Sequence, residues 1–160
     1  MRFEIVPMRE DDLTEVVAIE ELTGLNRWGF EAYRREMYSN PNAVMYVARA
    51  GDHLAGPRNE AGEPYRILGF VASALLFDEL HINNIATRPE VRRLGIGRAL
   101  MDTAMEDGRL RGASFSVLEV RASNVTAQAM YQAMGFRASR RRKDYYRTPA
   151  EDALEMIRDL

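Results

Sequence analysis

The chain has 160 residues, of which 46% are hydrophobic and 29% are charged, a balance typical of one globular domain with a hydrophobic core. A formal net charge of -2 provides no overall field that would attract nucleic acid. The absence of cysteine excludes disulfides, thiolate metal sites and acyl transfer through a cysteine. No run of about 18 apolar residues occurs, and the N-terminus has the pattern of a strand rather than of a signal peptide. We therefore expect a cytoplasmic enzyme or binding protein without a metal, a membrane or direct contact with nucleic acid.

The first half of the chain predicts two helices set among strands. A strand is expected over Arg2–Met8, and a helix that begins near Asp12 follows it and stops at Gly24. A second helix is expected over Phe30–Tyr38. Apolar runs predict strands at 44–50 and 67–77, and the polar, glycine-rich and proline-rich stretch 51–64 between them predicts a loop. Strands that follow one another without a helix favour antiparallel pairing.

The second half alternates strands with helices. We expect strands at 82–87, 115–120, 136–141 and 153–157, and helices at 97–108 and 124–134. A loop that carries Tyr145 and Tyr146 is expected between the last two strands. The passage from strand through helix to strand implies a parallel pair. We therefore predict one domain over residues 1–160 of the α/β (α+β) class, with a mixed central sheet of about seven strands and four helices.

A basic turn with two glycines, Arg92–Arg98, lies between the strand at 82–87 and the helix that follows. Free backbone N–H groups and the positive end of a helix favour an anion, and Gly95 and Gly97 let the backbone approach it closely. The turn has no P-loop pattern, and the third glycine of a Rossmann fingerprint would fall on Leu100. The turn predicts a phosphate or pyrophosphate site, and a strand-to-helix turn without a ligand is the alternative.

Three residues further along the chain are candidates for chemistry. Glu119 lies on an apolar strand, where burial should raise its pKa and make it a general base; an ion pair with Arg121 is the alternative. Tyr131 lies on the apolar face of a helix, as a core tyrosine with a satisfied hydroxyl or as a proton donor. Asn124 begins that helix, as an N-cap or as a hydrogen-bond partner of a cofactor.

The turn pattern Arg-x-x-Gly-x-Gly resembles the acetyl-CoA motif of the GNAT superfamily of N-acetyltransferases. Further strings occur in a fixed order around it: Asn84–Ala86, Leu118–Asn124, Tyr131 with Gly135 and Phe136, Arg142 with Tyr145 and Tyr146, and Glu151–Leu154. Together they resemble the bacterial ribosomal-protein-alanine N-acetyltransferase family from Asn84 to the end of the chain, and Leu-Glu-Val-Arg-Ala-Ser-Asn is the most specific string.

The resemblance implies that acetyl-CoA lies in a cleft between two splayed parallel strands. It implies these cofactor-binding residues: Ile85, Ala86, Thr87, Arg92, Arg93, Leu94, Gly95, Ile96, Gly97, Arg98, Asn124 and Tyr131. A backbone N–H near Ile85 would hold the thioester carbonyl. Glu119 would take a proton from the acceptor amine, directly or through water, and Tyr131 would protonate the departing thiolate after direct transfer.

The resemblance also implies the acceptor, the N-terminal alanine of a small-subunit ribosomal protein, flanked by Tyr145 and Tyr146. Trp28 and Asn83 are further candidates for contact with the acceptor. Core packing for Trp28 and sheet-edge packing for the two tyrosines are the alternatives. A related enzyme with a wider range of N-termini or small amines, and an acyl-CoA-binding module without activity, are the competing functions.

His81 and Asn83 stand where the family usually has apolar residues, and Arg27 stands where a proline commonly precedes the tryptophan. The basic run 140–143 reads as a solvated strand end or as a site for an acidic peptide or RNA.

Overall fold

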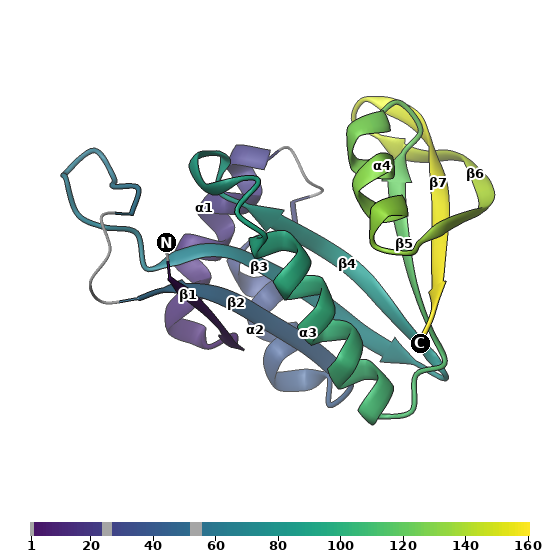
Figure 1. Ribbon diagram of the computed structural model, residues 1–160, viewed down its shortest axis with the longest axis horizontal. Helices are drawn as coiled ribbons and strands as arrows, with labels where there is room; N and C mark the ends of the chain where they lie inside the picture. The colour runs from purple at the N-terminus through teal and green to yellow at the C-terminus, as the bar shows by residue number, and fades with distance from the viewer. Residues whose placement is uncertain (1, 24–26, 52–55) are drawn as a thin grey trace.

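The computed structural model describes residues 2–23, 27–51 and 56–160, which form a seven-stranded sheet with helices on both faces (Figure 1). The strands are Phe3–Pro7 (β1), Ala43–Ala50 (β2), Ile67–Leu76 (β3), Glu79–Thr87 (β4), Phe115–Arg121 (β5), Arg137–Arg147 (β6) and Ala150–Asp159 (β7). The helices are Leu13–Thr23 (α1), Phe30–Ser39 (α2), Ile96–Leu110 (α3) and Val125–Ala133 (α4). The predicted mixed sheet with four helices is confirmed, whereas Gly24, the expected end of the first helix, lies outside the described residues.

The sheet opens between its two central strands. Its order is β1-β2-β3-β4-β5-β7-β6, and every neighbouring pair is antiparallel except β4 and β5. These two strands pair in parallel over Glu79–Ile82 and Phe115–Leu118, and α3 makes the crossover between them. Beyond Ile82 and Leu118 the ladder ends and the strands diverge, as Figure 1 shows. The expected pair of splayed parallel strands is therefore present.

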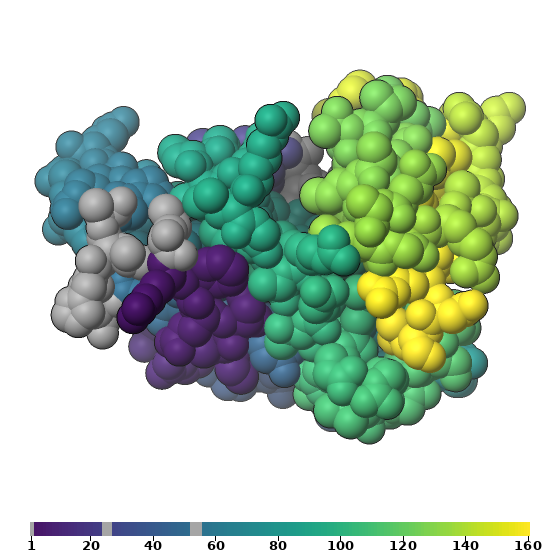
Figure 2. All heavy atoms as spheres, viewed as in Figure 1, coloured from purple at the N-terminus to yellow at the C-terminus, as the bar shows by residue number. Residues whose placement is uncertain are grey.

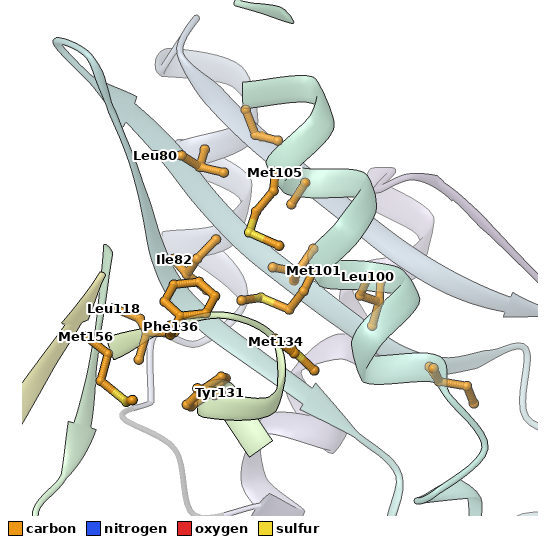
Figure 3. Close-up of a cluster of buried hydrophobic side chains, with 14 of the residues drawn as sticks. Leu80, Ile82, Leu100, Met101, Met105, Leu118, Tyr131, Met134, Phe136 and Met156 are labelled. Atoms are coloured by element: carbon orange, nitrogen blue, oxygen red, sulfur yellow. The ribbon is translucent and has the colours of Figure 1, made fainter. Parts of the chain in front are cut away.

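Two hydrophobic clusters, one on each face, hold the helices against the sheet. On the α1/α2 face, Leu13, Ile19, Tyr33 and Phe70 are fully buried. The α3/α4 face carries the larger cluster, in which Met101 and Met105 of α3, Tyr131 of α4 and Met134 just after it pack with Leu118 and Phe136 (Figure 3). Burial of each large apolar side chain contributes about 1.5–3 kcal/mol. This cluster joins the two halves of the sheet where their strands no longer pair.

A β-bulge in β4 lies at the point where the sheet opens. Ala72 of β3 pairs with Asn84, and Ser73 pairs with Ile82, so Asn83 is an extra residue in β4. An extra residue breaks the strict alternation of a strand and re-aims the neighbouring side chains. Asn83 and Asn84 consequently line the same cavity on the α1/α2 face. The sequence alone did not predict this bulge.

The last hairpin is longer than predicted, and Tyr145 and Tyr146 lie on strand β6 rather than in a loop. The register of β6 against β7 shifts between Arg142 and Tyr146, where Asp144 has a φ of 53°. Charge pairing with β7 supports this strand in place of apolar alternation, since its arginines face carboxylates: Arg140 with Glu155 and Arg141 with Asp152. An apolar pattern is absent here, so the sequence predicted a loop.

Candidate active site

The turn before α3 presents unpaired backbone donors. Arg93 and Gly95 adopt left-handed conformations, with φ values of 64° and 82°. The Ala99 N–H donates to the Gly95 carbonyl at 3.0 Å, which closes the first turn of the helix. The N–H groups of the three preceding residues, 96–98, have no backbone acceptor among the described residues. Together with the positive helix end, they form a cradle suited to a phosphate group.

The packing of the protein does not require a glycine at position 97, whereas a ligand at this turn would. A Cβ atom on Gly97 would have only the Thr87 methyl within 4 Å, at 3.9 Å, so the protein itself leaves this space free. Gly95 differs, because its positive φ favours glycine whatever the space around it. Arg92, Arg93 and Arg98 are exposed at the same turn. These residues fit the pyrophosphate of coenzyme A.

The edge of β4 that faces the gap offers further backbone donors. Arg88 donates its N–H to the Leu68 carbonyl of β3 at 2.8 Å. Because the groups of an antiparallel strand alternate in direction, the N–H groups of Ile85 and Thr87 point away from β3 and toward the gap. The Ala86 side chain is buried on the α1/α2 face, so only its backbone can contact a cofactor in the gap.

The two candidates on and before α4 have different environments. Asn124 caps the helix, with its side-chain oxygen accepting from the Ala127 N–H at 3.0 Å, so the N-cap interpretation is confirmed. Tyr131 packs edge-on against Phe136, with ring centroids 6.0 Å apart. Its ring belongs to the core cluster, and its hydroxyl has no hydrogen-bond partner among the described residues. Burial raises the pKa of Tyr131 to about 12, which keeps the proton on the phenol at neutral pH.

Glu119 is held between two basic side chains. Its Oε2 lies 2.7 Å from Nε2 of His81, and its Oε1 accepts from Nη1 of Arg142 at 3.0 Å. The Glu119 side chain is only 6% exposed. Burial raises its pKa, but the hydrogen bonds and charges of His81 and Arg142 outweigh burial and hold the pKa below its ordinary value. The predicted rise in this pKa is therefore wrong.

The alternative pairing of Glu119 with Arg121 is also wrong. Arg121 pairs with Glu151 at 3.4 Å and stacks on the Tyr146 ring. The hydrogen bond to Glu119 raises the pKa of His81, although its burial opposes the shift. In the sequence, His81 was noticeable only because the resembled family usually has an apolar residue at this strand position.

Glu119 lies at the wall of a cavity of about 100 Å³ that four parts of the chain enclose. Its lining residues are Trp28, His81, Asn83, Asn84, Glu119, Tyr145 and Tyr146. The structure therefore brings together the candidate base and all four residues predicted to contact the acceptor. Tyr145 and Tyr146 meet edge-on, and Arg142 and Arg121 stack on their respective rings.

A buried carboxylate on α1 fixes one side of the cavity. Glu20 accepts from the N–H groups of Trp28 at 2.7 Å and Gly29 at 3.2 Å. The hydroxyl of Tyr33 donates to it at 2.7 Å, and the Asn84 amide donates to that hydroxyl at 2.9 Å. Glu20 therefore ties the segment that carries Trp28 to β4. No pattern in the sequence indicates this network, because Glu20 is one of several polar residues on the predicted helix.

The cofactor turn and the cavity lie on opposite faces of the sheet. Tyr131 packs with Leu118 on the α3/α4 face, as Figure 3 shows, whereas Glu119 points to the α1/α2 face. The space-filling view shows a hollow between the N-terminal end of α3 and α4 (Figure 2). The ladder between β4 and β5 ends at Ile82 and Leu118, beside Glu119.

An opened parallel pair, an anion cradle on the crossover helix and a carboxylate at the opening define an acetyl-CoA-dependent N-acetyltransferase. The chain belongs to the Acetyltransferase (GNAT) family, which matches residues 13–136. The family consists of enzymes that use acetyl-CoA, so the interpretation as a module without activity is wrong.

The most informative relatives are bacterial. A Bacillus subtilis (strain 168) protein, provisionally assigned as a ribosomal protein bS18-alanine N-acetyltransferase, is 32% identical over 149 residues, 93% of this chain and 90% of the relative. The ribosomal protein bS18-alanine N-acetyltransferase of Escherichia coli (strain K12) is 38% identical over 93 residues, 57% of this chain and 63% of the relative. The crystal structure of the Escherichia coli ribosomal-protein-S18-alanine N-acetyltransferase superposes with a TM-score of 0.80 at 25% identity, covering 99% of this chain and 94% of that one.

No described helix combines the length and the apolar character needed to cross a bilayer.

The basic run on β6 is largely neutralised, since Arg140, Arg141 and Arg142 each pair with a carboxylate. The solvated strand end is therefore the better interpretation of this run than a site for RNA.

Proposed function

We propose that this enzyme acetylates the α-amino group of a protein N-terminus, with the N-terminal alanine of a small-subunit ribosomal protein as its acceptor. The cavity beside the opening of the sheet is the observation that carries the proposal, because its wall includes the Glu119 carboxylate next to the point where the β4–β5 ladder ends. The names of the relatives support the choice of acceptor. Alanine adds only a methyl group to the amine that has to enter a cavity of about 100 Å³.

Backbone groups on the α3/α4 face would bind and orient the cofactor. The N–H groups of residues 96–98 and the nearby arginines suit its pyrophosphate. The Ile85 N–H, which points into the gap, would donate to the carbonyl oxygen where negative charge develops. When bound, acetyl-CoA supplies an acetyl group activated as a thioester, which the acceptor amine attacks.

Two side chains would move the protons. An α-ammonium group has a pKa of about 8 and must first lose one proton to solvent to become the attacking amine, whose nitrogen becomes far more acidic as it bonds to the acetyl carbon. A carboxylate with a lowered pKa is therefore still a sufficient base, and Glu119 would take this proton into the cavity. Tyr131 keeps its proton at neutral pH, and its hydroxyl has no hydrogen-bond partner among the described residues, so it would donate to the departing sulfur. His81 would hold Glu119 ionised and fix the direction of Oε2.

The test is an assay of free thiol released from acetyl-CoA. The acceptor is a short peptide with the N-terminal sequence of the ribosomal protein, compared with the same peptide blocked at its α-amino group. Thiol release with the free peptide alone is the expected result. Release with the small amine alaninamide at a higher kcat/KM than with any peptide would overturn the peptide acceptor and favour the small-amine alternative.

A further inference from the structure

We propose that Arg142 competes with the acceptor for Glu119: in the free enzyme its guanidinium occupies the place at Oε1 that the α-ammonium group of the acceptor takes. This inference rests on the proposed function, because it assumes that an amine approaches Glu119 through the cavity. It assigns to Arg142 a control of acceptor affinity and no part in the chemical step.

The carboxylate of Glu119 has no free oxygen in this state. Arg142 donates to Oε1 at 3.0 Å, and His81 lies 2.7 Å from Oε2. Only 6% of the Glu119 side chain is exposed, so the cavity reaches little of the carboxylate while both partners are in place. His81 is fixed on β4 within the sheet, in the segment that pairs with β5. Arg142 is the partner that can leave.

The surroundings of Arg142 suit a side chain that moves. Its side chain is 38% exposed, and β6 is an edge strand of the sheet. The register with β7 shifts between Arg142 and Tyr146, so few ladder contacts hold this part of the strand. The guanidinium also lies over the Tyr145 ring, 4.9 Å from its centroid, and Tyr145 lines the cavity that the acceptor would enter. Entry of a peptide would thus disturb the second contact of Arg142 as well.

The exchange of one cation for another keeps the charge around Glu119 constant. The charged and titratable groups facing Glu119 are His81 with Glu79 from β4, Glu155 from β7, and Arg142, Tyr145 and Tyr146 from β6. Glu155 is itself neutralised by Arg140. An ammonium group can therefore replace the guanidinium without leaving the carboxylate unpaired, which would be costly in a buried site.

Displacement of Arg142 costs the same free energy whichever amine displaces it. The apparent affinity of every acceptor is therefore reduced by one common factor, the fraction of enzyme in which Glu119 is free. A peptide with additional contacts in the cavity can still bind, whereas a small amine with few contacts is excluded at ordinary concentrations. Arg142 would thus raise the number of contacts that any acceptor needs, without changing the ratio of affinities between two acceptors.

The experiment compares wild type with Arg142→Gln, using the acceptor peptide and alaninamide as two probes. We expect KM for both acceptors to fall by the same factor, roughly threefold to tenfold as for a half-exposed ion pair, with kcat not reduced. Arg142→Lys keeps a cation and should lie between the two. The matched control is Arg141→Gln, which removes the neighbouring arginine paired with Asp152 on β7 and should leave KM unchanged.

A measurement without any acceptor makes the outcomes distinguishable. The chain has only two histidines, so NMR can follow the titration of His81. The charge of Arg142 lowers the pKa of His81, and this pKa should therefore rise in Arg142→Gln and stay unchanged in Arg141→Gln. A KM that rises or stays constant for both acceptors in Arg142→Gln would overturn the competition. If wild type acetylates alaninamide but no peptide, the proposed function fails, and the comparison on alaninamide still decides the role of Arg142.

Discussion

Glu119 combines a buried position with two basic partners, and this combination leads to a clear prediction for its amide variant. Glu119→Gln keeps the shape of the side chain and removes the negative charge that would accept the proton. We expect kcat to fall by about 10²–10⁴-fold at neutral pH. The Kd of acetyl-CoA, measured by calorimetry, should stay nearly constant because the anion cradle lies on the opposite face of the sheet. A fully active variant would refute the role of Glu119 as base.

Tyr131 allows the packing of a ring to be separated from the chemistry of its hydroxyl. Tyr131→Phe keeps the edge-on contact with Phe136 and removes a hydroxyl without a hydrogen-bond partner among the described residues. We expect the free energy of unfolding to change by less than about 1 kcal/mol, since no hydrogen bond is lost. The rate of thiol release should fall by at least about tenfold. If the rate is unchanged, Tyr131 serves only the core.

The pair of His81 and Glu119 makes stability depend on pH in a defined window. The pKa of His81 is raised above 6.5, so its contribution is complete below that pH and is lost as the pH rises through the folded-state pKa. The pKa of Glu119 is lowered below 4.5, so its contribution is complete above that pH and is lost as the pH falls through the folded-state pKa. Both contributions coexist between pH 4.5 and 6.5.

A double-mutant cycle with His81→Gln and Glu119→Gln measures this coupling by urea unfolding. We expect a coupling free energy on the order of 1–2 kcal/mol near pH 5.5 that declines toward pH 9. A coupling that grows with pH would contradict the structure, because it would mean that neutral His81 is the form that Glu119 stabilises.

At the scale of elements, substitutions in α3 can distinguish residues that stabilise the fold from residues that leave room for the ligand. Gly97→Ala places a methyl group in space that the protein leaves free, and alanine favours a helix, so stability should stay equal or rise by up to about 1 kcal/mol. The same methyl group would occupy the cradle above the helix end, and the Kd of acetyl-CoA should rise at least about tenfold.

The control for that variant lies on the same helix. A Cβ on Gly108 would come within 3.0 Å of Leu80, so Gly108→Ala should lower stability and leave the Kd of acetyl-CoA unchanged in the folded protein. Unchanged affinity in Gly97→Ala would show that the cofactor does not approach this turn.

The elements that the sequence predicted well carry strong local signals. The turn before α3 has glycines and arginines at fixed spacing, and the strand around Glu119 has a specific string, so both could be placed in advance. The elements that it missed depend on distant partners. The bulge at Asn83 is defined by the register against β3, β6 is supported by carboxylates on β7, and the lowered pKa of Glu119 needs Arg142 from 23 residues away. No local pattern contains these relations.

At the scale of the whole molecule, the sheet consists of two halves that share few strand contacts. Four residues of β4 pair with four of β5, and the α3/α4 cluster supplies the remaining connection. We propose that residues 1–160 nevertheless unfold as one cooperative domain, because this cluster is continuous across both halves. Trp28, the single tryptophan, lies beside the cavity and reports on the first half by fluorescence, whereas circular dichroism reports on all elements.

The two probes should give coincident unfolding curves, and acetyl-CoA should shift both together because it would contact β4, α3 and α4 at once. At 100 times its Kd, a ligand that binds only the folded state stabilises it by about 2.7 kcal/mol, which corresponds to roughly 5–10 °C in Tm for a chain of this length. Gly97→Ala at the same ligand concentration should show a much smaller shift. If the fluorescence transition preceded the other and acetyl-CoA moved only one of them, the halves would be separate units and the cofactor would bind to one side of the gap alone.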